Sequence, residues 1–403
     1  MIDAAVHGPR RPHPAALPSG RSGRYTSVVA RPGAPASCAT GPRALPMRLS
    51  ILDQSVTVAG QGPAAAIRET VALARAADRL GYHRFWVSEH HGFPGLAGSA
   101  PMPLLGAIAA GTRRIRLGAA AVILPHAAPL KVAEEALVLE ALAPGRVDLG
   151  LGRGPGADRA TAYALSPELL DDPLARPGGG FADDVAAVLA FLSGAPMPPD
   201  HPFAGVAAVP APEGPGPAPF VVGGTARTAQ LAGRLGLPYA FAHFVADGAG
   251  ADDTLAAYRR TFVPSRFLAA PRVIVATFAA AAATASEAAG FHAAYRRWRA
   301  ARDVGAFRPI GHPSADDATP PAGPRPERFG TADVVVSDLH ALAESYGADE
   351  VVVAVPVADL GARLRAVRLI AAAAGLAAAP SRPRAIPTGV AARPSPFPTE
   401  LSP

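Results

Sequence analysis

Between residues 47 and 379, short apolar runs of strand length alternate with stretches of helical periodicity. Eight such runs occur, at residues 49–53, 85–88, 115–124, 147–151, 220–222, 239–241, 272–278 and 350–355. Apolar residues recur at helical spacing between them, at residues 64–80, 129–142, 181–192, 225–235 and 332–346. Strands that alternate with helices form parallel sheets, so the pattern predicts an α/β fold. Eight strands favour a (β/α)8 TIM barrel with insertions at the C-terminal face, although an open doubly wound sheet has the same pattern.

The two ends of the chain differ from this central part in composition. Residues 1–46 are rich in proline, glycine, serine and arginine and lack apolar periodicity, and residues 380–403 are similarly rich in proline, so we expect both to be disordered. Met47 directly precedes the first apolar run and is an alternative start of the protein. The sequence therefore predicts a disordered basic leader (1–46), a barrel (47–379) and a disordered tail (380–403).

The net charge of +6 also belongs to the ends. Residues 1–46 carry +5 and residues 380–403 carry +2, which leaves −1 for the central part. Nucleic-acid binding needs a concentrated basic patch on the folded surface, so we expect no nucleic-acid partner. The single cysteine, Cys38, excludes a disulfide scaffold and a cysteine-rich metal cluster. No apolar run reaches the roughly 18 residues of a membrane helix, so we expect a cytoplasmic protein that does not enter membranes.

Three ionisable side chains follow the second apolar run directly. The segment reads Phe85-Trp86-Val87-Ser88-Glu89-His90-His91. The carboxyl ends of barrel strands carry catalysis, so we predict that Glu89, His90 and His91 are catalytic, with one histidine as general acid/base or hydrogen-bond donor. The alternatives are a metal site made of the same three side chains and a packing role for a histidine at the strand end. Neighbouring strand residues point to opposite faces, and no further ligand lies at a suitable spacing, so we expect no metal.

Small residues mark the third apolar run, and glycines mark the fourth. The small residues of the third run are Ala119, Ala120, Ala121 and Val122. Such residues let a ligand approach the backbone closely, although tight packing of a barrel interior is an equal alternative. The fourth run ends in Gly152-Arg153-Gly154, a loose match to a dinucleotide fingerprint without the helix and second strand that such a site needs. We interpret Arg153 instead as a ligand for an anion.

The fifth apolar run leads into a glycine pair and then into a helix. The residues of interest there are Gly223, Gly224, Thr225 and Thr228. Unpaired N–H groups and the dipole at a helix N-terminus favour phosphate, so this segment predicts a phosphate site together with Arg153. An ordinary N-cap role for Thr225 is the alternative.

Taken together, these segments resemble the luciferase-like flavin monooxygenase family, the relatives of the bacterial luciferase alpha chain. The likeness spans about residues 47–375 and begins with LGYHRFWVSEHH at 80–91 and RIRLG at 114–118. Further blocks follow in the same order, at residues 124–125, 144–146, 153–154, 229–232, 236–238, 330–331 and 347–350. The sequence is most similar to single-chain members linked to natural-product oxidations.

The resemblance implies a TIM barrel that binds reduced FMN at the carboxyl ends of its strands. Such an enzyme acts on paired donors, using reduced FMN and O2 to oxidise a small organic substrate. By motif, Arg153, Gly224, Thr225 and Thr228 would hold the FMN phosphate, and residues 119–122 would lie against the flavin ring. A non-proline cis peptide of the family would fall at Ala120–Ala121. His90 matches the active-site histidine of the family, which Glu89 would help to orient.

The resemblance also implies partners. A separate flavin reductase would supply reduced FMN, because this chain shows no nicotinamide fingerprint of its own. Many members form homodimers through the helices that flank the second and third strands. Two features depart from the family pattern and leave the substrate open, namely His126 and the segment Gly92-Phe93-Pro94-Gly95.

Three other functions stay open at this stage. A deazaflavin (F420) dependent hydride-transfer oxidoreductase has the same scaffold and differs only subtly in sequence. A non-catalytic flavin-binding subunit is the second alternative, although the presence of Glu89, His90 and Arg153 argues against it. A metal-dependent barrel hydrolase is the third.

Overall fold

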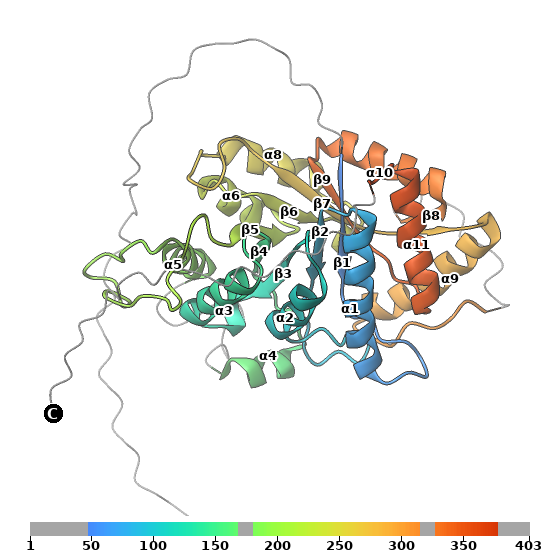
Figure 1. Cartoon of the computed structure of the whole chain (residues 1–403), viewed down its shortest axis with the longest axis horizontal. Coiled ribbons are helices and arrows are strands. Elements are labelled where there is room, and N and C mark those ends of the chain that lie inside the picture. Colours follow the sequence, from blue (N-terminus) through green and yellow to red (C-terminus); the bar gives the residue numbers. More distant parts are fainter. Residues whose placement is uncertain (1–46, 168–179, 315–326, 378–403) are drawn as a thin grey trace, which may run out of the picture. The chain divides into compact units, whose positions relative to one another are not determined.

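The computed structural model describes residues 47–167, 180–314 and 327–377, and its centre is a closed ring of parallel strands (Figure 1). The strands of the ring are β1 (Arg48–Asp53), β2 (Arg84–Val87), β3 (Arg116–Ile123), β4 (Val147–Gly152), β5 (Ala218–Gly223), β6 (Tyr239–Ala242), β7 (Val273–Ala282) and β9 (Glu350–Ala354). Each strand pairs with the next, and β9 pairs with both β7 and β1, which closes the ring. The predicted (β/α)8 TIM barrel is confirmed, because an open sheet would leave two edges unpaired.

One further strand was not predicted. β8 (Arg328–Thr331) pairs with the last four residues of β7, Ala279–Ala282, outside the ring. β7 has ten residues, so its carboxyl half extends past its other partners and offers a free edge. The sequence pattern missed β8 because a four-residue strand that follows a proline-rich stretch has no recognisable periodicity.

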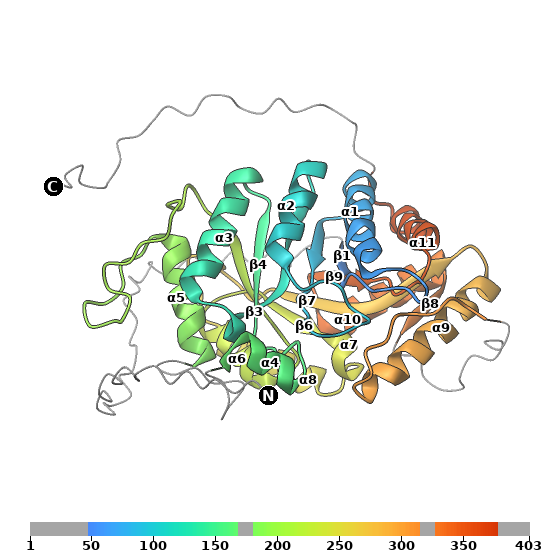
Figure 2. The same ribbon diagram turned by 90° about the horizontal axis from the view of Figure 1, so that it is seen from below.

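Helices surround the ring (Figure 2). They are α1 (Pro63–Leu80), α2 (Pro101–Gly111), α3 (Pro129–Leu142), α4 (Arg159–Leu165), α5 (Phe181–Ser193), α6 (Ala226–Arg234), α7 (His243–Ala246), α8 (Ala251–Thr261), α9 (Ala285–Asp303), α10 (Ala332–Tyr346) and α11 (Leu360–Ala373). Figure 2 shows α3, α2, α1 and α11 in succession, and each contacts the next. A helix ends where glycine takes the left-handed conformation, as at Gly81 with φ 85° and Gly347 with φ 54°.

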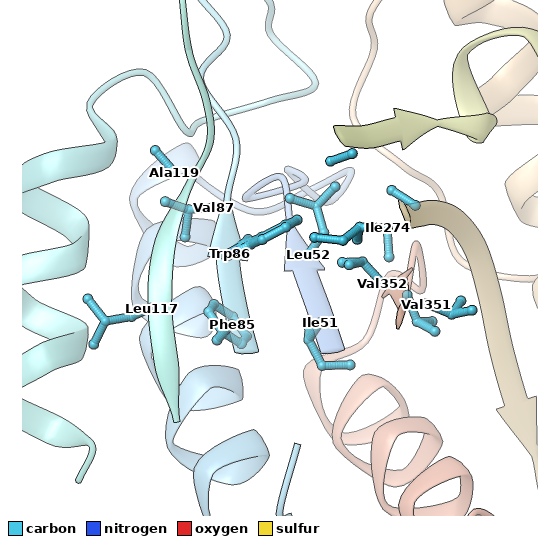
Figure 3. Packing of buried hydrophobic residues seen from close by; sticks show 14 of the residues in the cluster. Ile51, Leu52, Phe85, Trp86, Val87, Leu117, Ala119, Ile274, Val351 and Val352 are labelled. Carbon is cyan, nitrogen blue, oxygen red and sulfur yellow. The ribbon is translucent and has the colours of Figure 1, made fainter. Parts of the chain in front are cut away.

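A stacked aromatic pair fills the middle of the barrel. The rings of Trp86 on β2 and Phe220 on β5 lie 4.3 Å apart and 11° from parallel. Figure 3 shows Trp86 reaching from β2 toward Leu52, its register partner on β1. A β-carbon on Gly150 of β4 would lie 2.6 Å from the Phe220 ring, so only glycine fits there. Part of the glycine content of these strands therefore serves packing inside the barrel.

Beside the aromatic pair, a buried carboxylate connects three strands. Asp148 on β4 receives Arg84 Nη1 of β2 at 2.8 Å and Arg116 Nη2 of β3 at 2.6 Å. The indole Nε1–H of Trp86 donates to the same carboxylate at 3.0 Å. The charge of Asp148 is thus fully partnered, which a buried carboxylate requires.

Arg84 extends this network to two more strands. Its Nε donates to both carboxylate oxygens of Glu350 on β9, at 2.9 and 3.0 Å. The hydroxyl of Ser50 on β1 donates to Glu350 at 2.6 Å. Five consecutive strands of the ring are therefore held together by polar contacts near their amino ends.

The inserted segments lie in two places. The described part of the predicted 303–330 insertion runs over the loops that follow β1 and β2, because Ile310 N–H donates to the Thr57 carbonyl at 2.8 Å. The segment after α5 instead reaches the outer helices, where Val209 N–H donates to the Glu134 carboxylate of α3 at 3.1 Å. The predicted disordered ends, 1–46 and 380–403, lie outside the described residues.

We expect Asp148→Asn to lower the free energy of unfolding by about 3–5 kcal/mol, because it leaves two arginines without their buried carboxylate. Chemical denaturation measures this change. The control is Lys131→Met, which removes an exposed ion pair of 2.8 Å with Glu135 and should change stability by less than about 0.5 kcal/mol. A loss below about 1 kcal/mol for Asp148→Asn would contradict the role of the network.

Candidate active site

His90 stands just beyond the carboxyl end of β2. Its Nδ1 lies 3.0 Å from the hydroxyl of the buried Ser88. Its backbone N–H donates to the Gly98 carbonyl at 2.9 Å. The hydrogen bond at Nδ1 thus fixes the orientation of the His90 ring, and Nε2 has no partner among the described residues and is available to a ligand.

Glu89 and His91 form a second pair at the same strand end. Glu89 Oε1 lies 2.8 Å from His91 Nε2, and Glu89 Oε2 accepts the N–H of Ile123 at 3.0 Å. The backbone N–H of His91 donates to the Gly156 carbonyl at 2.9 Å. This pair therefore connects the end of β2 to the end of β3 and to the loop after β4.

These contacts correct the expectation that Glu89 orients His90. Consecutive residues of an extended chain point to opposite sides, whereas residues two apart share a side. The Ser88 side chain consequently hydrogen-bonds His90, and the Glu89 side chain hydrogen-bonds His91. The three ionisable side chains do not converge, and the described residues contain no group of three or more His, Cys, Asp or Glu placed to hold a metal ion.

Burial keeps His90 neutral. The pKa of His90 falls to about 3, because burial disfavours the charged ring and the nearby Arg302 and His91 add to this effect. In a neutral imidazole one nitrogen carries a hydrogen and donates, while the other accepts a hydrogen bond. A pKa this far below neutral makes the His90 ring a weak base. At neutral pH, His90 is therefore suited to hydrogen-bond a ligand through Nε2 while it stays uncharged.

His90 lines an open hollow of about 450 Å³. One wall is the beginning of α1, and the other is the segment that contains Phe93 and Leu96. The Phe93 ring stacks on Phe307 at 3.8 Å, and Gly95 N–H donates to the Phe307 carbonyl at 2.7 Å. The insertion after α9 therefore packs beside this hollow, as expected for insertions at the C-terminal face.

The small residues of β3 lie at the same end of the barrel. Ala119 and Val122 are buried, whereas Ala120 and Ala121 are partly exposed. The peptide bond Ala120–Ala121 is cis, as the family resemblance implied. A β-carbon on Gly152 of β4 would lie 2.8 Å from that of Ala121, so glycine lets the two strands approach here.

Arg153 comes directly after β4 and stands beside the end of β5. Gly152 is the register partner of Val222, which brings Arg153 to the level of Gly223. Arg153 is partly buried, and its guanidinium makes no hydrogen bond or ion pair with the described residues. A partly buried cation without a carboxylate is well placed to bind an anion.

The N-terminus of α6 follows β5 at this point. The Thr225 side chain caps the helix by accepting the N–H of Thr228, and the Thr228 hydroxyl donates to the Thr225 carbonyl at 2.8 Å. The N-cap role considered for Thr225 is therefore present. Gly224 and Thr225 are exposed, and no atom lies within 4 Å of a β-carbon placed on Gly224. The helix end thus has room for a ligand beside Arg153.

Two residues near His90 were not predicted from the sequence, Phe307 and Arg302. Both lie at or just after the end of α9, a helix that the pattern analysis did not identify. One signal could have indicated Arg302, because Trp298 precedes it by four residues and shares its helix face. The arginine lies over that indole, 5.6 Å from the ring centre.

Comparison with known proteins identifies the family. The family model for luciferase-like monooxygenases matches residues 47–329. YwcH of Bacillus subtilis is 42% identical over 240 residues, which cover 60% of this chain and 70% of that protein. The N-acetyl-S-alkylcysteine monooxygenase of Bacillus subtilis is 40% identical over 216 residues, which cover 54% and 62% of the two chains. The chain belongs to the luciferase-like monooxygenase family.

Solved structures share the fold. Apo-MsnO8 is 33% identical with a TM-score of 0.73, and the match covers 83% of this chain and all of that one. An FMN complex of the oxygenating constituent of 3,6-diketocamphane monooxygenase from Pseudomonas putida has a TM-score of 0.60, with 19% identity and coverage of 81% and 97%. An F420-dependent secondary alcohol dehydrogenase has a TM-score of 0.58, with 14% identity and coverage of 82% and 99%. The last two likenesses concern the fold alone.

No helix in the described part of the chain has the length and apolarity to cross a membrane.

We expect the His90 ring to remain neutral between pH 5 and pH 8, because its pKa lies at about 3. An NMR titration of the histidine rings measures this, with His90→Gln identifying the signal. The unfolded chain takes up this proton near pH 6.5, so His90 lowers the stability of the fold as pH falls below that value. A titration midpoint near 6.5 in the folded protein would contradict the assignment.

Proposed function

We propose that this protein is a flavin-dependent monooxygenase that uses reduced FMN and O2 to oxidise a small organic substrate. The observation that carries the proposal is Arg153, which has no partner among the described residues and lies beside the open N-terminus of α6. A cation, several backbone N–H groups and the positive end of a helix dipole together suit a phosphate group.

The residues present fit the cofactor. Its phosphate would lie against Arg153 and the start of α6, with these residues taking part: Gly223, Gly224, Thr225 and Thr228. Its ring would lie against the small residues of β3, which are Ala119, Ala120, Ala121 and Val122. These four residues have small side chains, which leave room for a flat ring, and Ala120 and Ala121 are partly exposed.

The chain's own residues would position and protect the reaction. Reduced flavin, when bound, would supply the two electrons that reduce O2, so that one oxygen atom enters the substrate and the other leaves as water. His90, neutral and held through Nδ1 by Ser88, would hydrogen-bond the reacting group through Nε2. Glu89 and His91 would keep the loops after β2, β3 and β4 in place, and the Phe93–Phe307 stack would limit access of water beside His90.

The test compares two reduced cofactors. With reduced FMN, a panel of small organic compounds and O2, the protein should release oxidised product, and His90→Ala should abolish product formation while FMN binding stays unchanged. The readout is product by mass spectrometry, because free reduced flavin consumes O2 unaided. Ser193→Ala, on α5 away from the site, is the control.

Three results would contradict the proposal. Reduction of a compound by reduced F420 without oxygen transfer would favour the deazaflavin enzyme. Tight FMN binding without any product would favour a non-catalytic flavin-binding subunit. Full activity of His90→Ala would remove the role of that histidine.

Two partners complete the proposal. A separate flavin reductase would supply reduced FMN from solution. A second copy of the chain would cover an apolar groove of about 420 Å³ between α2 and α3, where Val138 is 48% and Leu142 66% exposed. Exposed apolar side chains that line one groove are typical of an interface.

We expect Leu142→Asp to convert a dimer into a monomer, because it places a charge in the apolar groove. Light scattering coupled to gel filtration measures the mass. Val334→Asp, which changes an exposed apolar residue of α10, should leave the mass unchanged. A wild-type protein that is already monomeric, or a Leu142→Asp variant that stays dimeric, would show that this groove is not the interface.

A further inference from the structure

Arg302, at the end of α9, forms no ion pair with a described carboxylate, and the acidic side chain that acts on its charge is Asp303, its neighbour in the chain. Its guanidinium carbon lies 5.6 Å from the ring centre of Trp298 and 5.3 Å from that of Phe307. Its Nη1 is buried without a hydrogen-bond partner, and the described residues offer the guanidinium no ion pair. Arg302 as a whole is only partly buried, so its side chain is not sealed off from solvent.

By contrast, the guanidinium of the neighbouring Arg299, on the same helix, forms ion pairs and hydrogen bonds. Arg299 pairs with Asp303 at 2.8 Å and with Asp247 at 3.3 Å, and it donates to the Phe244 carbonyl at 2.9 Å. These contacts engage Asp303, the acidic residue next to Arg302 in the chain. Arg302 is therefore left with aromatic faces only, which stabilise a cation less than a carboxylate does.

A continuous row of rings connects Arg302 to the active-site histidine. His90 lies 6.4 Å from Phe93, Phe93 stacks on Phe307 at 3.8 Å, and Arg302 lies over Phe307. Arg302 is close enough to His90 to contribute to lowering its pKa. The guanidinium thus adjoins the Phe93 wall of the hollow through the Phe307 ring and does not itself line the hollow.

The site is unfavourable for a cation in the absence of a ligand. Burial, together with the charge of Arg299, lowers the pKa of Arg302 to about 10. An unpaired cation held at such a place costs stability, and an anionic ligand would remove that cost. The planar guanidinium is suited to a carboxylate, because it presents parallel N–H donors to both oxygens.

We infer that Arg302 binds the carboxylate of the organic substrate, so that the enzyme oxidises carboxylic acids whose reacting group reaches His90. This inference rests on the proposed monooxygenase function and narrows its substrate class. The flavin phosphate is another oxyanion that could engage a guanidinium. Its candidate site belongs to β4, β5 and α6, whereas Arg302 belongs to α9 and adjoins the loop after β2.

The test measures binding without turnover. Pairs of a carboxylic acid and its primary amide, with aromatic and alkyl bodies, are titrated into the FMN-loaded protein, and calorimetry gives each affinity. The acids should bind at least about tenfold more tightly than their amides. Arg302→Met should remove this preference while amide and FMN affinities stay the same. Arg308→Met, an exposed arginine six residues further on, should keep the preference.

Each other outcome would overturn the inference. Equal affinities of acids and amides, or no binding of any acid, would show that Arg302 does not select a carboxylate. Loss of FMN affinity in Arg302→Met would assign the guanidinium to the flavin phosphate. If Arg302→Met does not fold, Arg302→Lys takes its place. Lysine keeps the positive charge but lacks the paired N–H donors of the guanidinium, so this variant should weaken acid binding and leave the amide and FMN affinities unchanged. Because no step depends on O2, failure here leaves the monooxygenase test unaffected.

Discussion

The Asp148 carboxylate is the interaction on which the barrel depends most. It lies fully inside the ring of strands, where an unpaired charge would be strongly unfavourable. Two arginines form ion pairs with this carboxylate, and an indole N–H from a neighbouring strand donates a hydrogen bond to it. One of these arginines, Arg84, also forms an ion pair with Glu350. These partners must stand at one level, so the network fixes the relative register of five strands. The position of every loop at the opposite end follows from that register.

Stability and chemistry therefore occupy opposite ends of the barrel. The ion network lies near the amino ends of the strands, and the stacked Trp86 and Phe220 fill the middle. The carboxyl ends carry Arg153 after β4 and His90 after β2, which we propose to contact the ligands. This division is general for TIM barrels, in which loops at the carboxyl ends vary without loss of the core.

The sequence predicted the barrel well because each of its eight ring strands is a short apolar run between helices. It missed β8 and the helices α2, α4, α7, α8, α9 and α11, because these helices are short or rich in alanine and show weak apolar periodicity. The glycines and histidines of the site were recognised from their positions after strands. The partner predicted for Glu89 was wrong, because Glu89 pairs with His91 rather than with His90. The position of Arg302 depends on how α9 packs, and no local pattern contains that information.

The central claim is that the end of β4 and the start of α6 bind the phosphate of FMN. The most direct measurement is the FMN affinity of Arg153→Met, compared with Arg234→Met, which changes an exposed arginine at the opposite, carboxyl end of α6. The account predicts that Arg153→Met weakens FMN binding by at least about tenfold, while its affinity for riboflavin, which lacks the phosphate, stays the same. Arg234→Met should bind FMN as the wild type does. Unchanged FMN affinity in Arg153→Met, or an equal loss for riboflavin, would contradict the account.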